Sequence, residues 1–373
     1  MKQIVYFSYI LFLILFAIFS FAFIDPNLFY LKSLYSGIYL KNRELVTGIY
    51  ISSLIIFFAY YIFFLLDKKN LNLQKVISLI IPSIVILLFA YPAIVSYDIF
   101  NYIASSKILF LYKENPYIVM PIDITHEPLL AFMHAANKTA LYGFVWIIFT
   151  GIPFFLGFYN FVLTLFTFKF FVICFYIVSI YIIWKLSKNI SSILLFALNP
   201  LVLLQTVVSG HNDIVMMFLV LTSFLAMKNK KIALALFLFM LSIFIKYATI
   251  MLLPLFIYFI FSKNKNINWE KVYLWSAGLM FTIFLLSQLR EEIYPWYAVW
   301  FMPFIFLQNK KWLIILTIAL SFGLLLRDVP FMLLGTYFGP TPMLKVIVTI
   351  SIPLITLIAL LAPKIWSKKF YLK

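Results

Sequence analysis

The sequence predicts an all-α fold of the integral membrane class, with about 12 transmembrane helices in one domain spanning residues 1–373. Hydrophobic residues make up 65% of the chain and charged residues only 11%, whereas soluble domains carry about 25% charged residues. Apolar runs of about 18 or more residues recur along the chain, and this is the length that a helix needs to cross a bilayer. Because backbone polar groups in lipid must be satisfied within the segment, these runs are expected to be helices.

The apolar segments can be placed in order along the chain. The expected helices are 4–24, 48–66, 76–94, 162–184, 190–208, 213–227, 232–246, 247–262, 271–288, 296–309, 311–326 and 345–362. The first is too long for the core of a signal peptide and lacks a small-residue cleavage site, so we expect it to be a membrane helix. The stretch 143–160 is broken by glycines and a proline, and a full crossing there would put Lys185 and Lys188 outside. We therefore expect re-entrant or interfacial helices there, within a large non-cytoplasmic loop at 95–161.

The positive charges place the N-terminus in the cytoplasm. A net charge of +17 would suggest nucleic acid for a soluble protein, but here most lysines cluster in short segments between apolar runs, as in cytoplasmic loops. With a cytoplasmic N-terminus nearly every basic cluster falls inside, the pair Lys41 and Arg43 being the exception. We therefore expect a multi-pass protein of the cell membrane without a nucleic-acid partner. Only three of the 29 basic residues are arginines (Arg43, Arg290 and Arg327), and the single cysteine, Cys174, can form no internal disulfide.

The acidic residues gather on the opposite side of this topology. Ten of the twelve fall in non-cytoplasmic segments: Asp25, Glu44, Asp98, Glu114, Asp123, Glu127, Asp213, Glu291, Glu292 and Asp328. Carboxylates near a membrane are costly unless they are paired or used, so this distribution predicts a polar site on the outer face. The alternative is that the outer loops are simply longer and collect the acids of the chain.

The segment Ser96–Tyr102, directly after the third expected helix, is the first candidate for chemistry. It places the carboxylate of Asp98 at the boundary between membrane and water, among aromatic residues. A partly buried carboxylate there suits a general base that takes a proton from a hydroxyl group. Equally, Asp98 could cap the helix that follows.

A second candidate is the sequence Gly210-His211-Asn212-Asp213, which follows the mid-helix pair Asn199-Pro200. An imidazole, an amide and a carboxylate in a row offer donors and acceptors for sugar hydroxyls or phosphate, although the same sequence is ordinary for a turn. The remaining histidines, His126 and His134, belong to a different loop, and no metal-ligand spacing is recognisable, so no metal site is predicted.

Two further cationic positions lie toward the outer face. Lys246 stands alone in an apolar stretch at the expected turn between two helices, where it would either contact a lipid phosphate or extend its side chain to the interface. Arg290 precedes a run of aromatic residues that includes Trp296 and Tyr297. A guanidinium group binds phosphate in a fork and aromatic rings can stack on a sugar, but interfacial aromatics also serve as membrane anchors.

Taken in order, these motifs resemble those of the polyprenol-phosphate-mannose-dependent α-mannosyltransferases of the GT-C type, and the chain is similar to the actinobacterial α-1,6-mannosyltransferases. The resemblance runs from about Phe23 to Pro303. It rests on Ser96–Tyr102, Asn115-Pro116-Tyr117, Tyr142-Gly143, Asn199–Leu204, His211–Asp213, Lys246 and Pro295–Tyr297. The chain departs from the family pattern in two places. Phe144-Val145 stands where relatives have Pro-Leu after the Tyr-Gly pair, and Tyr97 stands where they usually have Arg.

The resemblance implies transfer of a hexose, most simply mannose, from a polyprenyl-phosphate sugar to a hydroxyl of a glycan or glycolipid, with inversion. Asp98 would be the base, and Lys246, Arg290 and His211 would bind the donor phosphate. The side chains expected to bind sugar or acceptor are Tyr97, Asn101, Tyr102, Tyr117, Glu127, Tyr142, Asn212, Asp213, Trp296 and Tyr297. No cofactor is implied; a divalent cation would be compatible with this chemistry, but nothing in the sequence indicates one.

The competing class of function is a transporter or flippase of a lipid-linked sugar. A transporter favours charges near the midplane and inverted repeats. Here the charges gather at the outer face and no internal repeat is recognisable. A non-catalytic partner in an envelope complex is a third interpretation, and the sugar, its linkage and the acceptor are not fixed by the sequence.

Overall fold

The computed structural model describes residues 3–24, 37–261, 267–289 and 292–370, and the side chains of all but the last eight of these. Every regular element in these ranges is a helix, which confirms the all-α class. Within the described ranges, six helices are long and apolar enough to cross a membrane. They are Gln3–Phe23, Arg43–Asn70, Phe161–Ser187, Trp269–Leu289, Lys311–Leu334 and Thr341–Ala362. A seventh span is formed if one bent pair is counted as a single crossing.

These spans are built on the long α-helices of the chain. They are α1 (Gln3–Ser20), α4 (Arg43–Leu66), α9 (Phe161–Ser187), α15 (Trp269–Leu286), α17 (Lys311–Leu326) and α19 (Thr341–Phe370). The other apolar helices are shorter: α5 (Leu73–Leu88), α12 (Asp213–Lys228), α13 (Ile232–Ile243), α14 (Leu253–Phe261) and α16 (Met302–Gln308). At 1.5 Å per residue, none of the shorter helices covers a full bilayer alone.

Several predicted helices end early or are broken. The segment 190–208 is not one helix, because α10 (Ile190–Ala197) and the segment Pro200–Val208 meet at a bend of 56°. The cause is local. Pro200 cannot continue a helix from the preceding turn, and the Asn199 side chain accepts the backbone N–H of Leu201 at 2.9 Å, which starts the new helix α11 (Pro200–Leu203).

Other predicted spans are shortened by 3₁₀ turns. The expected helix 76–94 is α5 followed by the separate turn η4 (Pro92–Ile94), and the expected helix 296–309 divides into η10 (Pro295–Trp300) and α16. The expected helix 247–262 begins with the 3₁₀ segment η8 (Tyr247–Leu252) before α14. Proline at the first position of both η4 and η10 starts these turns.

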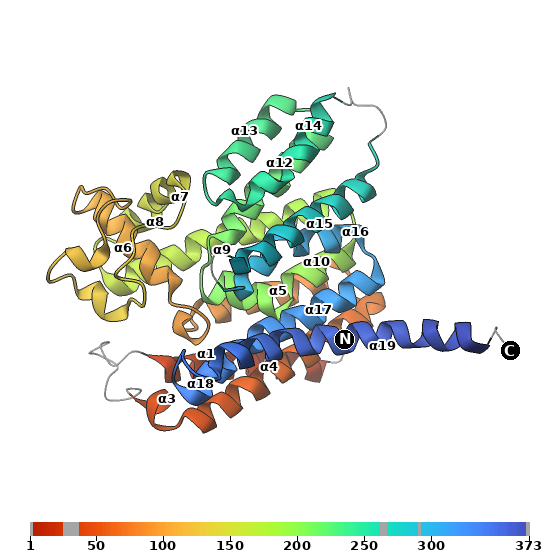
Figure 1. Cartoon of the computed structure of the whole chain (residues 1–373), viewed down its shortest axis with the longest axis horizontal. Coiled ribbons are helices and arrows are strands. Elements are labelled where there is room, and N and C mark those ends of the chain that lie inside the picture. Colours follow the sequence, from red (N-terminus) through yellow and green to blue (C-terminus); the bar gives the residue numbers. More distant parts are fainter. Residues whose placement is uncertain (1–2, 25–36, 262–266, 290–291, 371–373) are drawn as a thin grey trace.

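The loop 95–161 folds into short helices at one end of the long ones, where α6 (Asp98–Phe110), α7 (Phe144–Phe149) and α8 (Gly151–Leu156) lie together (Figure 1). The pair α7 and α8 occupies the stretch where interrupted helices were predicted. Gly143 docks this loop onto the segment before η8, because its N–H donates to Ile245 O at 3.0 Å. A Cβ at Gly143 would lie 2.0 Å from Phe244 O, so only glycine permits this approach.

A buried lysine fixes the end of α5, and sequence reasoning did not identify it. The Nζ of Lys169, on α9, donates to Leu87 O, Leu88 O and Ala90 O, and its side chain is 1% exposed. The last carbonyls of a helix have no partner within the helix, so this lysine satisfies groups that would otherwise be buried and unpaired. It thereby anchors the turn that leads into Ser96 and Asp98.

Candidate active site

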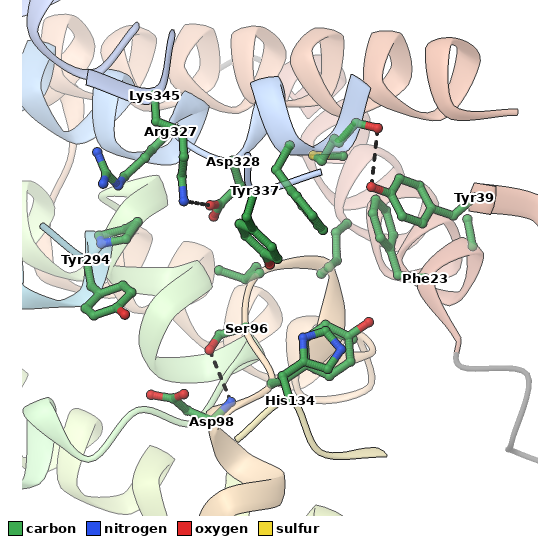
Figure 2. Close-up of a pocket in the computed structure, with 18 of the residues that line it drawn as sticks. Phe23, Tyr39, Ser96, Asp98, His134, Tyr294, Arg327, Asp328, Tyr337 and Lys345 are labelled. Carbon is green, nitrogen blue, oxygen red and sulfur yellow. Dashed lines mark hydrogen bonds and ion pairs between the residues drawn. The ribbon is translucent and has the colours of Figure 1, made fainter. Parts of the chain in front are cut away.

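A cavity of about 500 Å³ lies where the ends of α4, α17, α18 (Val329–Leu334) and α19 meet the start of the loop 95–161. Its lining includes Ser96, Asp98 and His134 at one end and Arg327 and Lys345 at the other. Figure 2 shows these two groups on opposite sides of the cavity.

Asp98 is the first residue of α6, and its side chain is 27% exposed. The N-cap position is Tyr97, which makes no side-chain capping bond, and the Ser96 hydroxyl accepts the backbone N–H of Asp98 at 3.2 Å. Ser96 therefore supplies the hydrogen bond at this helix start, while the Asp98 carboxylate lines the cavity. The position suits a group that acts on a molecule in the cavity.

The side chain of His211 lies beside Asp98, with 3.6 Å between His211 Nδ1 and Asp98 Oδ2. The Tyr102 hydroxyl is 3.5 Å from the same nitrogen. Gly210, with φ of +68°, turns the chain after the π-helical segment η7 (Leu204–Val208) and presents His211 to α6. Burial, and after it the charge of Lys246, lower the pKa of His211 well below its ordinary value. The imidazole is therefore neutral and acts as a hydrogen-bonding group.

The next two residues, Asn212 and Asp213, are fully buried beside His211 and do not line the cavity. Asn212 accepts a hydrogen bond from the Tyr102 hydroxyl at 3.2 Å. One oxygen of Asp213, Oδ1, accepts from Lys246 Nζ at 2.8 Å and from Trp300 Nε1 at 2.5 Å. The Asp213 side chain is 1% exposed, so this carboxylate neutralises Lys246 in a buried ion pair. Lys246 is not among the residues that line the cavity.

A group of stacked aromatic rings, called here the aromatic wall, packs beside these buried residues. Trp296 stacks on His211 with 4.0 Å between ring centroids, and Tyr294 stacks on Trp296 with 4.5 Å between ring centroids. Tyr297 stacks on Trp300 at 4.2 Å, and Lys246 Nζ lies 4.7 Å from the Tyr297 ring centroid. The predicted pair Trp296 and Tyr297 is thus adjacent to the predicted His-Asn-Asp sequence, as a sugar site would require.

Other predicted side chains are distributed differently. Tyr142 packs edge-on against Tyr102 with 4.8 Å between ring centroids, and Tyr97 stacks on His134 at 3.7 Å. Tyr117 donates to Tyr142 O at 2.8 Å and lines a separate groove. Arg290 lies outside the described residues.

Glu127 belongs to a cluster apart from the cavity. It accepts hydrogen bonds from Lys107 at 2.6 Å, from the Tyr112 hydroxyl at 2.5 Å and from the Leu129 N–H at 3.0 Å. Burial alone would raise the pKa of Glu127, but the bonds from Lys107, Tyr112 and Leu129 hold it below its ordinary value. In this arrangement Glu127 starts the turn η6 (Pro128–Phe132) and orders the loop.

Several buried polar atoms around η7 have no hydrogen-bond partner among the residues that the structure describes. These atoms are Gln205 Oε1 and Nε2, His211 Nε2, Asn212 Nδ2, Asp213 Oδ2 and, from α6, Asn101 Oδ1. An unpaired buried polar group costs about 1–3 kcal/mol, so such a concentration marks a place where water or ligand hydroxyls complete the bonding. Among the described residues, no group of three or more His, Cys, Asp or Glu is placed to hold a metal ion.

Sequence reasoning missed four contributors to this site. Trp300 and Gln205 carry no charge and sit in apolar runs, so no local pattern marked them. Arg327 and Lys345 come from helices far along the chain from Asp98. The rarity of arginine was the one signal that could have identified Arg327.

These features define a class: a helical membrane protein in which a carboxylate, backed by a buried neutral imidazole, faces a cavity with aromatic lining at the ends of the helices. The family model described as α-(1→6)-mannopyranosyltransferase, N-terminal domain, matches residues 17–262. The chain belongs to this family, which confirms the resemblance and supports a mannosyltransferase over a transporter. Comparison with curated proteins gave no match, and neither did comparison with solved structures.

Proposed function

We propose that this protein transfers mannose from a polyprenyl-phosphate donor to a hydroxyl of a glycan or glycolipid on the non-cytoplasmic side of the membrane, with inversion. The observation that carries the proposal is the Asp98 carboxylate, which lines the cavity 3.6 Å from a buried imidazole in a chain of this family. Family membership supports the sugar, and the donor and the stereochemistry are our inference.

In the proposed reaction, Asp98 takes the proton of the acceptor hydroxyl as that oxygen attacks the anomeric carbon. The bond from this carbon to the phosphate oxygen breaks, and the lipid phosphate leaves with the bonding electrons. A single displacement of this kind inverts the anomeric centre, and a positioned base contributes roughly 10²–10⁴-fold to its rate. Neutral His211 and Tyr102 would orient the Asp98 carboxylate.

The sugar would occupy the part of the cavity between Asp98 and the aromatic wall, next to the unpaired polar atoms of Asn101 and Asn212. Sugar hydroxyls supply the donors and acceptors that these atoms lack, and the Trp296 ring offers an apolar face. Tyr97, Tyr142 and Tyr297 surround this region as the further predicted contacts.

The orientation also belongs to the proposal, together with a GT-C architecture of about 12 crossings in which short and broken helices cross in pairs. It is supported by the positions of lysines and carboxylates relative to two helices. Helix α5 carries Lys75 in its first turn and ends before Asp98, and α17 begins at Lys311 and ends before Arg327 and Asp328 at the cavity. The lysine-rich ends would face the cytoplasm.

A labelling experiment tests this orientation. In a Cys174→Ala background, Asn229→Cys should be protected from an impermeant thiol reagent in intact cells, whereas Ile118→Cys, at a position that is 73% exposed, should react. The opposite labelling pattern would refute the proposed sidedness.

The activity itself is tested by supplying labelled polyprenyl-phosphate mannose to membranes that contain the protein. We expect transfer of label to a lipid-linked or glycan acceptor, and loss of that transfer in Asp98→Asn. Absence of transfer with this donor, but transfer from another activated mannose, would overturn the donor assignment.

A further inference from the structure

The end of the cavity opposite Asp98 holds a cluster of cations on α17 and α19. Arg327 Nη2 and Lys345 Nζ both bind one oxygen of Glu292, at 2.9 Å and 2.7 Å. The side chains of Arg327 and Lys345 are only 7% and 6% exposed, whereas that of Glu292 is 43% exposed. Asp328 lies 4.0 Å from Lys345 Nζ. The two cations are thus buried, whereas the carboxylate that binds them is partly exposed.

A third cation, Arg43 at the start of α4, lines the same cavity. Its guanidinium group lies 5.3 Å from the Tyr39 ring centroid, and its buried Nη1 has no hydrogen-bond partner among the described residues. Among those residues, the charged side chains at this end of the cavity are the cations Arg43, Arg327 and Lys345 and the carboxylates Glu292 and Asp328. The cations outnumber the carboxylates, as the binding of an anionic phosphate ester requires.

The identity of these cations is informative. The chain has 29 basic residues, of which three are arginines, yet two of those three line this cavity. A guanidinium group binds phosphate with two parallel hydrogen bonds, and it stays charged when buried. Because lysine dominates the basic residues of this chain, the presence of two arginines in one cavity indicates a site that recognises the geometry of an anion.

We infer that Arg43, Arg327 and Lys345 form the subsite for the phosphate of the lipid-linked donor, with Glu292 as the carboxylate that the phosphate displaces. This inference rests on the proposed function and assigns the phosphate to a different place from Lys246, whose charge Asp213 already neutralises. Arg327 and Lys345 also lie beyond the residues 17–262 that the family model matches.

The position relative to the base supports the assignment. Figure 2 shows Tyr294 between Arg327 and Asp98, with Lys345 and Asp328 on the side of Arg327. A sugar whose phosphate is bound by the cations would therefore lie on the side of the cavity where Tyr294 and Asp98 are found. The cavity is also lined by the apolar side chains of Phe23, Phe331 and Met332, which are suited to contact an isoprenoid chain.

The test measures binding of farnesyl phosphate and of farnesol to the purified protein in detergent, which requires no sugar transfer. We expect farnesyl phosphate to bind more tightly than farnesol. Arg327→Gln and Lys345→Gln should each weaken only farnesyl phosphate, by roughly tenfold or more, because each removes one charge-assisted contact. Lys138→Gln, at an exposed loop position outside the cavity, is the matched control and should change neither.

A second variant guards against loss of folding in the first two. Glu292→Gln keeps both cations and removes the competing carboxylate, so farnesyl phosphate should bind threefold or more tightly. If the cluster served only to hold the helices together, Glu292→Gln would weaken binding or leave it unchanged, and the inference would be overturned. Competition by phosphatidylinositol in place of farnesyl phosphate would assign the site to an acceptor lipid and would also overturn it.

This design separates the subsite from the proposed activity. If the protein binds farnesyl phosphate more tightly than farnesol but does not transfer mannose from polyprenyl-phosphate mannose, the subsite is upheld and the donor assignment is refuted. Mannose transfer with farnesyl phosphate binding unaffected by Arg327→Gln and Lys345→Gln would uphold the activity and refute the subsite.

Discussion

Lys246 and Lys345 each bind a carboxylate, at 2.8 Å and 2.7 Å, but their surroundings differ. The partner of Lys246 is Asp213, whose side chain is 1% exposed and also accepts a hydrogen bond from Trp300. The partner of Lys345 is Glu292, whose side chain is 43% exposed and is shared with a second cation. A molecule entering the cavity can therefore reach the carboxylate of Glu292 and not that of Asp213.

This difference distinguishes a structural ion pair from an exchangeable one. Removing one partner from a buried pair leaves a charge without compensation, so such a pair stays closed. An exposed pair contributes little to stability, and its cation can change partners when an anion binds. We therefore regard the Lys246–Asp213 pair as the structural support of the site and the Glu292 cluster as its anion-binding part.

The largest effect is expected at Asp98, which lines the cavity. Asp98→Asn should reduce mannose transfer by roughly 10²–10⁴-fold, because the amide cannot accept a proton from the acceptor hydroxyl. Farnesyl phosphate binding should stay unchanged, since the Asp98 carboxylate serves the acceptor. Asparagine caps helices as well as aspartate does, so transfer at the wild-type rate would mean that Asp98 only starts α6.

The buried pair should respond to the loss of its acid. Asp213→Asn leaves Lys246 without a carboxylate and should lower the free energy of unfolding by about 3 kcal/mol. The shift of the thermal unfolding midpoint in detergent measures this loss. Glu292→Gln is the comparison variant, and its midpoint should move less, because the Glu292 side chain is 43% exposed and Asp328 still lies 4.0 Å from Lys345. Equal shifts for the two variants would remove the distinction between the regions.

The Glu127 cluster provides a buried ion pair outside the cavity. Glu127→Gln should destabilise the protein at neutral pH by about 1–3 kcal/mol, because a charged acceptor of three hydrogen bonds is lost. The folded-state pKa of Glu127 lies below its ordinary value, so the stabilisation is present above the unfolded-state pKa and disappears as pH falls through the folded-state pKa.

Comparing the unfolding midpoints of wild type and Glu127→Gln across this acid range checks the predicted direction of the pH dependence. Their unfolding midpoints should converge as the pH is lowered, while farnesyl phosphate affinity at neutral pH stays the same in both. A change of that affinity in Glu127→Gln would connect Glu127 to the donor site.

The smallest effect is expected at Lys246. Lys246→Met should leave farnesyl phosphate affinity within about twofold of the wild type, or roughly 0.4 kcal/mol, because Lys246 does not line the cavity. The comparison should be made at a temperature at which both proteins are folded. A loss of tenfold or more would return the phosphate to Lys246, as the sequence first suggested, and would reverse the assignment of the two regions.

Much of the site was predictable from local sequence. Asp98, His211, Asn212, Asp213, Trp296 and Tyr297 were identified from polar residues at helix ends and from the family resemblance, and the fold brings them together. Glu127 and Tyr117 were identified by the same rule, but Glu127 binds Lys107 and Tyr117 lines a separate groove. A long loop can fold back on itself in many ways, so its sequence does not fix these contacts.

The sequence by itself determined the all-helical class, the membrane-length apolar runs and the segments that carry polar chemistry, because hydrophobic length and charge placement are local properties. Only the tertiary structure decided how those segments pair. It bent the predicted helix at Asn199, buried Lys169 against the end of α5 and joined Lys246 to Asp213 across 33 positions of the chain. It also placed Arg327 and Lys345 in one cavity with Asp98. Such pairings depend on which helix ends meet in space, and no local pattern of residues encodes that.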